Sequence, residues 1–200
     1  PYWITEHIKI PNHKNRYMAT ASAKYEFADW INVTARAKMD RNNERRERMY
    51  DAGTNTLFAS KYGYYSKSNI ENQQIYGELL LNINKYFVDN TLNVTANVGG
   101  NFENNDYQSD YFGGKLKSVA NLFTFGNVDT SEKNLANQYG YHLKKRAIFG
   151  SAQIGYKSMA YLDVTARNDW SSTFKGTNTG SFFYPSIGLS GIITDIFLSL

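Results

Sequence analysis

Two aspartates are the residues of this sequence best suited to catalysis. Asp163 and Asp169 lie in a segment that alternates between polar and apolar residues, as a strand does. Paired carboxylates are the acid and base of glycoside hydrolysis, but strand geometry would separate these two by about 20 Å. Because that distance is too long for both to act on one bond, both are interpreted as polar residues of a strand face. No enzymatic activity is predicted.

Metal, cofactor and nucleic-acid chemistry have little support in the sequence. His7, His13 and His142 lack the spacing of a metal site, and the chain contains no cysteine. The segment 41–49, RNNERRERM, is basic, but its two glutamates dilute the charge. It is interpreted as a solvated loop or a contact with anionic lipopolysaccharide rather than a nucleic-acid patch. No metal, cofactor or nucleic-acid partner is therefore expected.

Clustered tyrosines between the predicted strands are the candidate substrate contacts. Flat aromatic faces with Asn and Asp nearby suit stacking on sugars. Packing within the loops is the more ordinary explanation for any one of these residues. The candidates are Tyr62, Tyr64, Tyr65, Tyr107, Tyr111, Tyr139 and Tyr141.

Strands with two different faces must position these residues. Three related segments, INVTAR, LNVTAN and LDVTAR, contain Val33, Val94 and Val164, and each valine is followed by a threonine. Strict alternation with β-branched residues indicates strands. The valines are predicted to face lipid and the threonines to face a lumen.

The alternating segments group into hairpins separated by long polar connections. The predicted strand regions are 17–39 (a hairpin turning at Asp29-Trp30), 75–87, 92–102, 147–157, 161–170 and 182–193. Further turns are expected at Asp89-Asn90, Ser158-Met159 and Thr194-Asp195, the last leading into a truncated eighth strand. Long connections are expected at 40–72 and 103–142, and residues 1–16 are expected to be irregular.

Short turns that alternate with long loops are typical of an outer-membrane β-barrel, whose spanning strands need about 9–11 residues. The predicted fold class is all-β: an antiparallel transmembrane β-barrel fragment of about seven full strands plus a stub. The alternative is a soluble two-sheet protein, such as a β-rich carbohydrate-binding module. In a soluble sandwich, connections of 30–40 residues would be unusual.

Two motifs give the sequence a family resemblance. TARNDWSS at 165–172 is followed, one loop later, by FFYPSIGLS at 182–190, and the chain starts with PYW. In this order they resemble the SusC/RagA-like TonB-dependent outer-membrane transporters. Lys175 stands where a proline is common in that family, and Gly191 where a Trp is common. The motif residues with an implied structural role are Thr165, Ala166, Arg167, Asn168, Asp169, Trp170, Phe183, Tyr184 and Pro185.

The resemblance implies that the chain is part of a larger transporter in the Gram-negative outer membrane. Such proteins have a barrel of about 22 strands filled by a plug, so residues 1–200 are expected to be part of the barrel domain. A SusD-like lipoprotein would cover the extracellular side, and the TonB complex would act on a region N-terminal to this chain. The implied cargo is an oligosaccharide or peptide, and the turns near Trp30, Asn90 and Met159 would be periplasmic. A passive porin or an adhesin barrel is the alternative.

Overall fold

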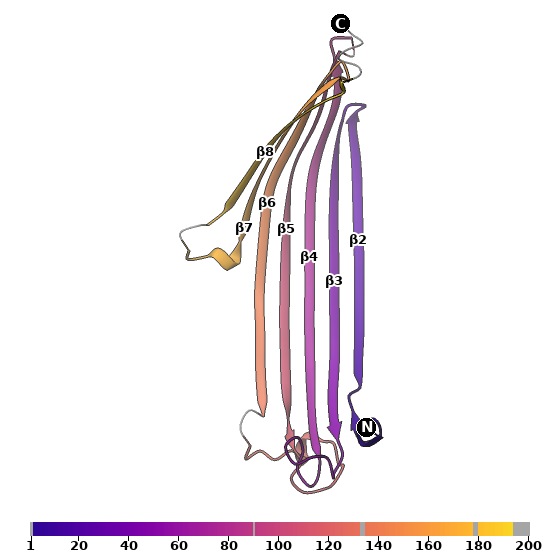
Figure 1. Ribbon diagram of the computed structural model, residues 1–200, viewed down its shortest axis with the longest axis vertical. Helices are drawn as coiled ribbons and strands as arrows, with labels where there is room; N and C mark the ends of the chain where they lie inside the picture. Colours follow the sequence, from indigo (N-terminus) through magenta and orange to yellow (C-terminus); the bar gives the residue numbers. More distant parts are fainter. Residues whose placement is uncertain (1, 90, 133–134, 178–179, 194–200) are drawn as a thin grey trace. The chain divides into compact units, whose positions relative to one another are not determined.

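The computed structural model describes residues 2–89, 91–132, 135–177 and 180–193 (Figure 1). All described strands belong to one sheet, ordered β1-β3-β4-β5-β6-β7-β8, and β2 also pairs with β3. One short helix, α1 (Tyr2–His7), precedes them. No helix in the described part of the chain is long and apolar enough to cross a membrane. The strands are β1 (Ile8–Lys9), β2 (Asn12–Ala28), β3 (Ile31–Tyr50), β4 (Tyr64–Phe87), β5 (Leu92–Lys115), β6 (Ala136–Tyr156), β7 (Ala160–Ser171) and β8 (Phe182–Gly191).

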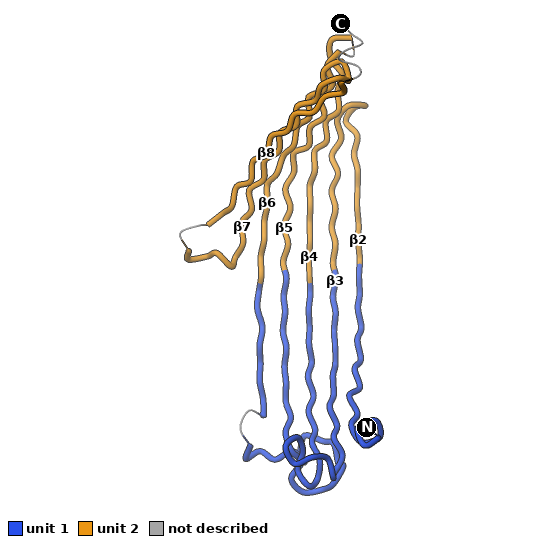
Figure 2. Tube along the Cα trace, in the orientation of Figure 1, with its two compact units in different colours: residues 1–18, 40–73, 105–142 blue, residues 19–39, 74–104, 143–200 orange. Residues whose placement is uncertain are grey.

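The chain divides into two compact units, coloured separately in Figure 2. Unit 1 contains residues 1–18, 40–73 and 105–142, and unit 2 contains residues 19–39, 74–104 and 143–200. Unit 2 includes the hairpin turns, and unit 1 includes the long connections.

The predicted hairpins of unit 2 are confirmed, with small shifts at two of the turns. Asp29 and Trp30 form the first turn, as expected. Val88 and Asp89, which follow the end of β4, have φ values of 53° and 50°, so the second turn begins one residue earlier than predicted. The third turn is centred on Lys157 and Ser158, because Met159 N donates to Tyr156 O at 2.9 Å; it lies one residue earlier than predicted. The predictions for Asn90 and for Thr194-Asp195 fall outside the described residues.

The predicted lengths of the connections in unit 1 were wrong. β3 continues to Tyr50, β4 begins at Tyr64, β5 continues to Lys115 and β6 begins at Ala136. The polar residues here are paired across strands: Arg16 contacts Asp40 at 2.6 Å and Arg41 contacts Glu71 at 3.2 Å. Such strands lack an apolar row, so hydrophobic alternation could not reveal them. The N-terminal segment, expected to be irregular, likewise forms α1, β1 and the start of β2.

Unit 1 has a small core of its own. Tyr65, Leu116 and Val128 are buried, and Met49, Phe112, Phe123 and Leu135 are among the residues packed against them. The buried Asn127 organises the segment around this core. Its Nδ2 donates to the carbonyl oxygens of Val119 and Leu122, at 2.7 and 3.0 Å, and its Oδ1 accepts from the backbone of Ser118 and Val119. The conformation of residues 118–127 therefore depends on the Asn127 side chain, which both donates and accepts hydrogen bonds.

An Asn127→Asp substitution tests this dependence. The carboxylate keeps the two accepted bonds but cannot donate to Val119 or Leu122, so we expect unit 1 to lose about 2 kcal/mol of local stability. Faster protease cleavage of residues 116–128 in native conditions would report the loss. Asn55→Asp is the matched control, because only its Oδ1, which accepts from Leu57 N at 2.9 Å, is used. Equal cleavage rates in the two variants would contradict the role given to Asn127.

Candidate functional site

The polar face of unit 2 carries a row of paired amide and hydroxyl side chains. Each pair joins neighbouring strands, so the row crosses β3, β4, β5, β6 and β7. The pairs are Asn32–Asn82 (2.8 Å), Asn84–Asn93 (3.0 Å), Asn97–Ser151 (3.3 Å) and Gln153–Asp163 (2.8 Å). Paired amides retain free donors and acceptors, so this face can hydrogen-bond peptide or sugar groups.

The opposite face of unit 2 is apolar and exposed. Val164 lies opposite Ala152 of β6 and Ile187 of β8 in the strand register, and 42% of its surface is exposed. Other large apolar side chains of this unit are also exposed: Leu79, Val98, Phe102, Ile148, Ile154, Phe183, Ile187 and Leu189. Since all described strands belong to one sheet, no second sheet covers this face, and the two-sheet sandwich is not what the described chain forms.

Charged residues on the polar face are neutralised in pairs. Arg36 contacts Glu78 at 3.1 Å, and the hydroxyl of Tyr76 donates to the same carboxylate at 2.7 Å. Arg167 contacts Asp169 at 2.9 Å, and its guanidinium lies over the ring of Phe149, 5.3 Å from the centroid. These interactions hold the long side chains close to the sheet.

A hollow of about 620 Å³ lies beside this charged group. Its lining combines aromatic rings with charged groups that can accept or donate hydrogen bonds. Its members include Tyr76, Asn101, Glu103, Arg167, Asp169, Phe182 and Tyr184. Tyr76 and Phe182 were not predicted as lining residues, because only the pairing of β4 through β8 in the sheet brings them together.

Asp163 and Asp169 have separate partners. Asp163 accepts from Gln153, while Asp169 is held by Arg167. Both are polar residues of a strand face, as interpreted from the sequence. No group of three or more His, Cys, Asp or Glu residues that could hold a metal occurs in the described part of the chain.

The family motifs meet directly in the sheet. β7 carries the TARNDW residues and β8 carries FFYP, and the two strands are antiparallel neighbours. Arg167 lies opposite Tyr184, Asn168 opposite Phe183, and Ala166 opposite Pro185. Two motifs separated in sequence by a loop therefore form one structural patch.

Histidines and the basic segment have local structural partners. His7 Nδ1 lies 3.0 Å from Asp51, and His142 pairs with Asp106. The segment 41–49 is part of β3 rather than a loop, so that prediction was wrong. Arg45 and Arg46 pair with carboxylates of the same strand, as in Arg46–Glu44 at 2.6 Å, while Arg41 pairs with Glu71 of β4.

The seven candidate tyrosines of unit 1 have different surroundings. Tyr65 belongs to the small core, and Tyr62 packs against it. The hydroxyls of Tyr64 and Tyr111 are hydrogen-bonded at 2.7 Å. Burial and, to a smaller extent, this hydrogen bond raise the pKa of Tyr111 from its ordinary value to about 12. These four side chains are used inside the unit.

Tyr107, Tyr139 and Tyr141 form a separate aromatic cluster. The rings of Tyr107 and Tyr141 stack with centroids 5.2 Å apart, and Tyr139 packs edge-on against both. Tyr139 and Tyr141 are 59% and 45% exposed. Of the seven candidates, these two present the most open ring surface to a ligand.

Comparison with known proteins identifies the fold. No protein-family model matches the chain, and no curated protein matches it. Two solved structures, described as the RagAB peptide transporter and as the RagAB peptide importer in the "open-open" state, superimpose with a TM-score of 0.87 each. In both cases the identity is 17%, and the match covers 100% of this chain and 22% of the other chain. The chain therefore has the fold of a section of each of those longer chains, and it spans about a fifth of their length.

Proposed function

We propose that this chain is a section of an outer-membrane barrel that imports nutrients actively, as SusC/RagA-like transporters do. The observation that carries the proposal is a single sheet with one exposed apolar face and one hydrogen-bonded polar face. Large apolar areas are rarely left in water, whereas lipid would cover them favourably. The polar face would then line the lumen. This role is that of a conduit and not of an enzyme.

Aromatic residues near the hairpin turns support the membrane setting. Phe27, Trp30, Phe87 and Tyr156 are all exposed at this end of unit 2, and Lys85 lies over the Trp30 ring at 4.3 Å. Aromatic and basic side chains are enriched at the level of the lipid headgroups. We place these turns in the periplasm and the long connections of unit 1 outside the cell. Residues 1–200 would form only part of the barrel domain.

The proposed partners follow from the family resemblance. A SusD-like surface lipoprotein would close over the extracellular side, and the TonB complex would supply energy through a part of the protein outside this chain. The cargo would be an oligopeptide or oligosaccharide, since both offer the hydrogen-bonding groups that the amide row and the hollow at Arg167 can bind. The RagAB structures are those of a peptide importer.

Energised uptake by the full-length protein tests the proposal. We expect the protein to sediment with the outer membrane, and uptake of a labelled oligopeptide or oligosaccharide mixture to fall to background when a protonophore collapses the proton gradient. Uptake that continues without the gradient would indicate a passive porin. Recovery of the protein in the detergent-free soluble fraction would instead favour a carbohydrate-binding module.

The exposed tyrosines give a prediction about cargo. If Tyr139 and Tyr141 stack on the cargo, replacing both by Ala should weaken the apparent affinity in the uptake assay about tenfold, because aromatic contact area is lost. Replacing both by Phe keeps the rings and should change the affinity less than about twofold. An alanine variant with wild-type affinity would remove these residues from the cargo path.

A further inference from the structure

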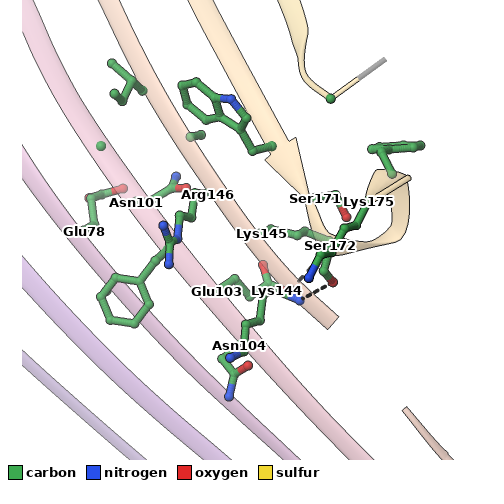
Figure 3. Close-up of a pocket in the computed structure, with 18 of the residues that line it drawn as sticks. Glu78, Asn101, Glu103, Asn104, Lys144, Lys145, Arg146, Ser171, Ser172 and Lys175 are labelled. Carbon is green, nitrogen blue, oxygen red and sulfur yellow. Dashed lines mark hydrogen bonds and ion pairs between the residues drawn. The ribbon is translucent and has the colours of Figure 1, made fainter. Parts of the chain in front are cut away.

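An apolar groove of about 1300 Å³ crosses β4, β5, β6 and β7 in unit 2 (Figure 3). Gly77 and Gly100 leave its floor without side chains, and the Phe102 ring lies over Gly77. Its apolar lining also includes Leu79, Ile148, Trp170 and Phe174. Leu79, Phe102 and Ile148 are all more than half exposed. The groove therefore lies on the apolar face, and its volume and apolar lining suit a hydrocarbon chain.

Four cations line the same groove, and three of them, Lys144, Arg146 and Lys175, carry the argument. Arg146 lies opposite Trp170 in the strand register, so the two side chains share a face, and Lys144 lies two residues earlier on that face. Lys175 follows the short 3-10 helix η2 (Ser172–Phe174) and completes the group. All three are exposed. Lys175 is also the position at which this sequence departs from the proline common in the resembling family.

Two carboxylates line the groove as well, and other cations neutralise them. Glu78 pairs with Arg36 at 3.1 Å, and Glu103 pairs with Lys145 at 3.7 Å. Within the described residues, no carboxylate lies in ion-pair distance of Lys144, Arg146 or Lys175. Three positive charges beside an apolar groove are therefore left for an external anion.

We propose that this groove binds one anionic lipid of the outer leaflet. The phosphate of a phosphorylated glycolipid would lie against Lys144, Arg146 and Lys175, and one acyl chain would lie along Leu79, Phe102 and Ile148. This inference rests on the proposed function, because it assumes that the apolar face meets lipid and that the long connections are extracellular. It goes beyond that function by naming a single lipid-binding site.

The charge pattern favours a phosphorylated lipid over general contact with the bilayer. Arg146 can donate two parallel hydrogen bonds to a phosphate, and the two lysines add charge. At the turn end of the same face, Lys85 lies over the rings of Trp30 and Phe87. Lys85 is a cation that does not line the groove, so it serves as a matched control.

Native mass spectrometry of the detergent-solubilised full-length protein can test the site. Lipid A with both phosphates is titrated against the wild type, K144Q/R146Q/K175Q, R146Q and K85Q. We expect the triple variant to bind at least tenfold more weakly, R146Q to be intermediate, and K85Q to stay within about twofold of wild type. Dephosphorylated lipid A should bind wild type as weakly as the triple variant binds the intact lipid.

Three outcomes would overturn the inference. Equal binding of phosphorylated and dephosphorylated lipid A would mean that the cations do not select the ligand. Full competition by inorganic phosphate at the lipid's concentration would mean that the acyl groove contributes nothing. A triple variant that binds like wild type would place the lipid elsewhere. Outer-membrane sedimentation and uptake of the same variants are measured in parallel, so failure of the lipid site is distinguished from failure of the proposed function.

Discussion

Val164→Arg is expected to destabilise the membrane-inserted protein by about 2–4 kcal/mol, because a charged side chain on the lipid face of a barrel strand must enter hydrocarbon. Val164 lies within β7 on the exposed apolar face, between Ala152 and Ile187 of the neighbouring strands. Its environment in the folded protein would be acyl chains, which cannot hydrogen-bond a guanidinium. Unfolding by guanidinium chloride from lipid vesicles measures the change.

Thr165→Arg is the matched control for that substitution. Thr165 is the next residue of the same strand, so its side chain points to the polar face, where charged residues are already present. We expect a cost of about 1 kcal/mol or less. If the two variants lose equal stability, or if Thr165→Arg loses more, the assignment of faces to lipid and lumen is wrong.

Gly113→Ala should destabilise unit 1 by about 3 kcal/mol. A Cβ at this position would lie 2.2 Å from the Cβ of Ser66, 2.3 Å from its Cα and 2.5 Å from the carbonyl oxygen of Tyr65. Because two of these are backbone atoms, no rotamer change can relieve the clash. The strands β4 and β5 would have to separate next to the small core at Tyr65. Thermal unfolding and protease cleavage at residues 51–63 would reveal the loss.

Gly126→Ala provides the comparison for Gly113→Ala. A Cβ on Gly126 would meet no atom within 4 Å, and this glycine does not require a positive φ. We expect a change of about 0.5 kcal/mol in either direction. A Gly113→Ala protein as stable as Gly126→Ala would show that β4 and β5 are not as closely apposed as the structure indicates.

The strands of unit 2 could be predicted from the sequence, whereas many of those in unit 1 could not. In unit 2 the predicted strands and turns agree with the structure to within a few residues, because each strand has an apolar row that alternates with a polar one. In unit 1 loops were predicted at 40–72 and 103–142, where β3, β4, β5 and β6 extend well into the predicted loops. There the strands are held by polar pairs such as Arg16–Asp40, which hydrophobic patterning does not reveal.

The candidate tyrosines show the same limit at the level of single residues. All seven lie in aromatic clusters along the chain, and nothing local distinguishes Tyr65, which is buried, from Tyr139, which is exposed. The difference arises from Leu116 and Val128, which are distant in sequence and cover Tyr65. A cargo role for the exposed pair stays a prediction.

The sequence by itself determined the two-faced strands, the hairpin turns and the family motifs, because side-chain alternation and turn conformation depend on neighbouring residues. Only the tertiary structure decided which residues share a site. Cross-strand register, set by backbone hydrogen bonds between distant segments, joined Arg167 to Tyr184 and placed Arg146 opposite Trp170. The amide row, the hollow at Arg167 and the apolar groove with its cations all depend on that register, so none of them could be predicted from the sequence alone.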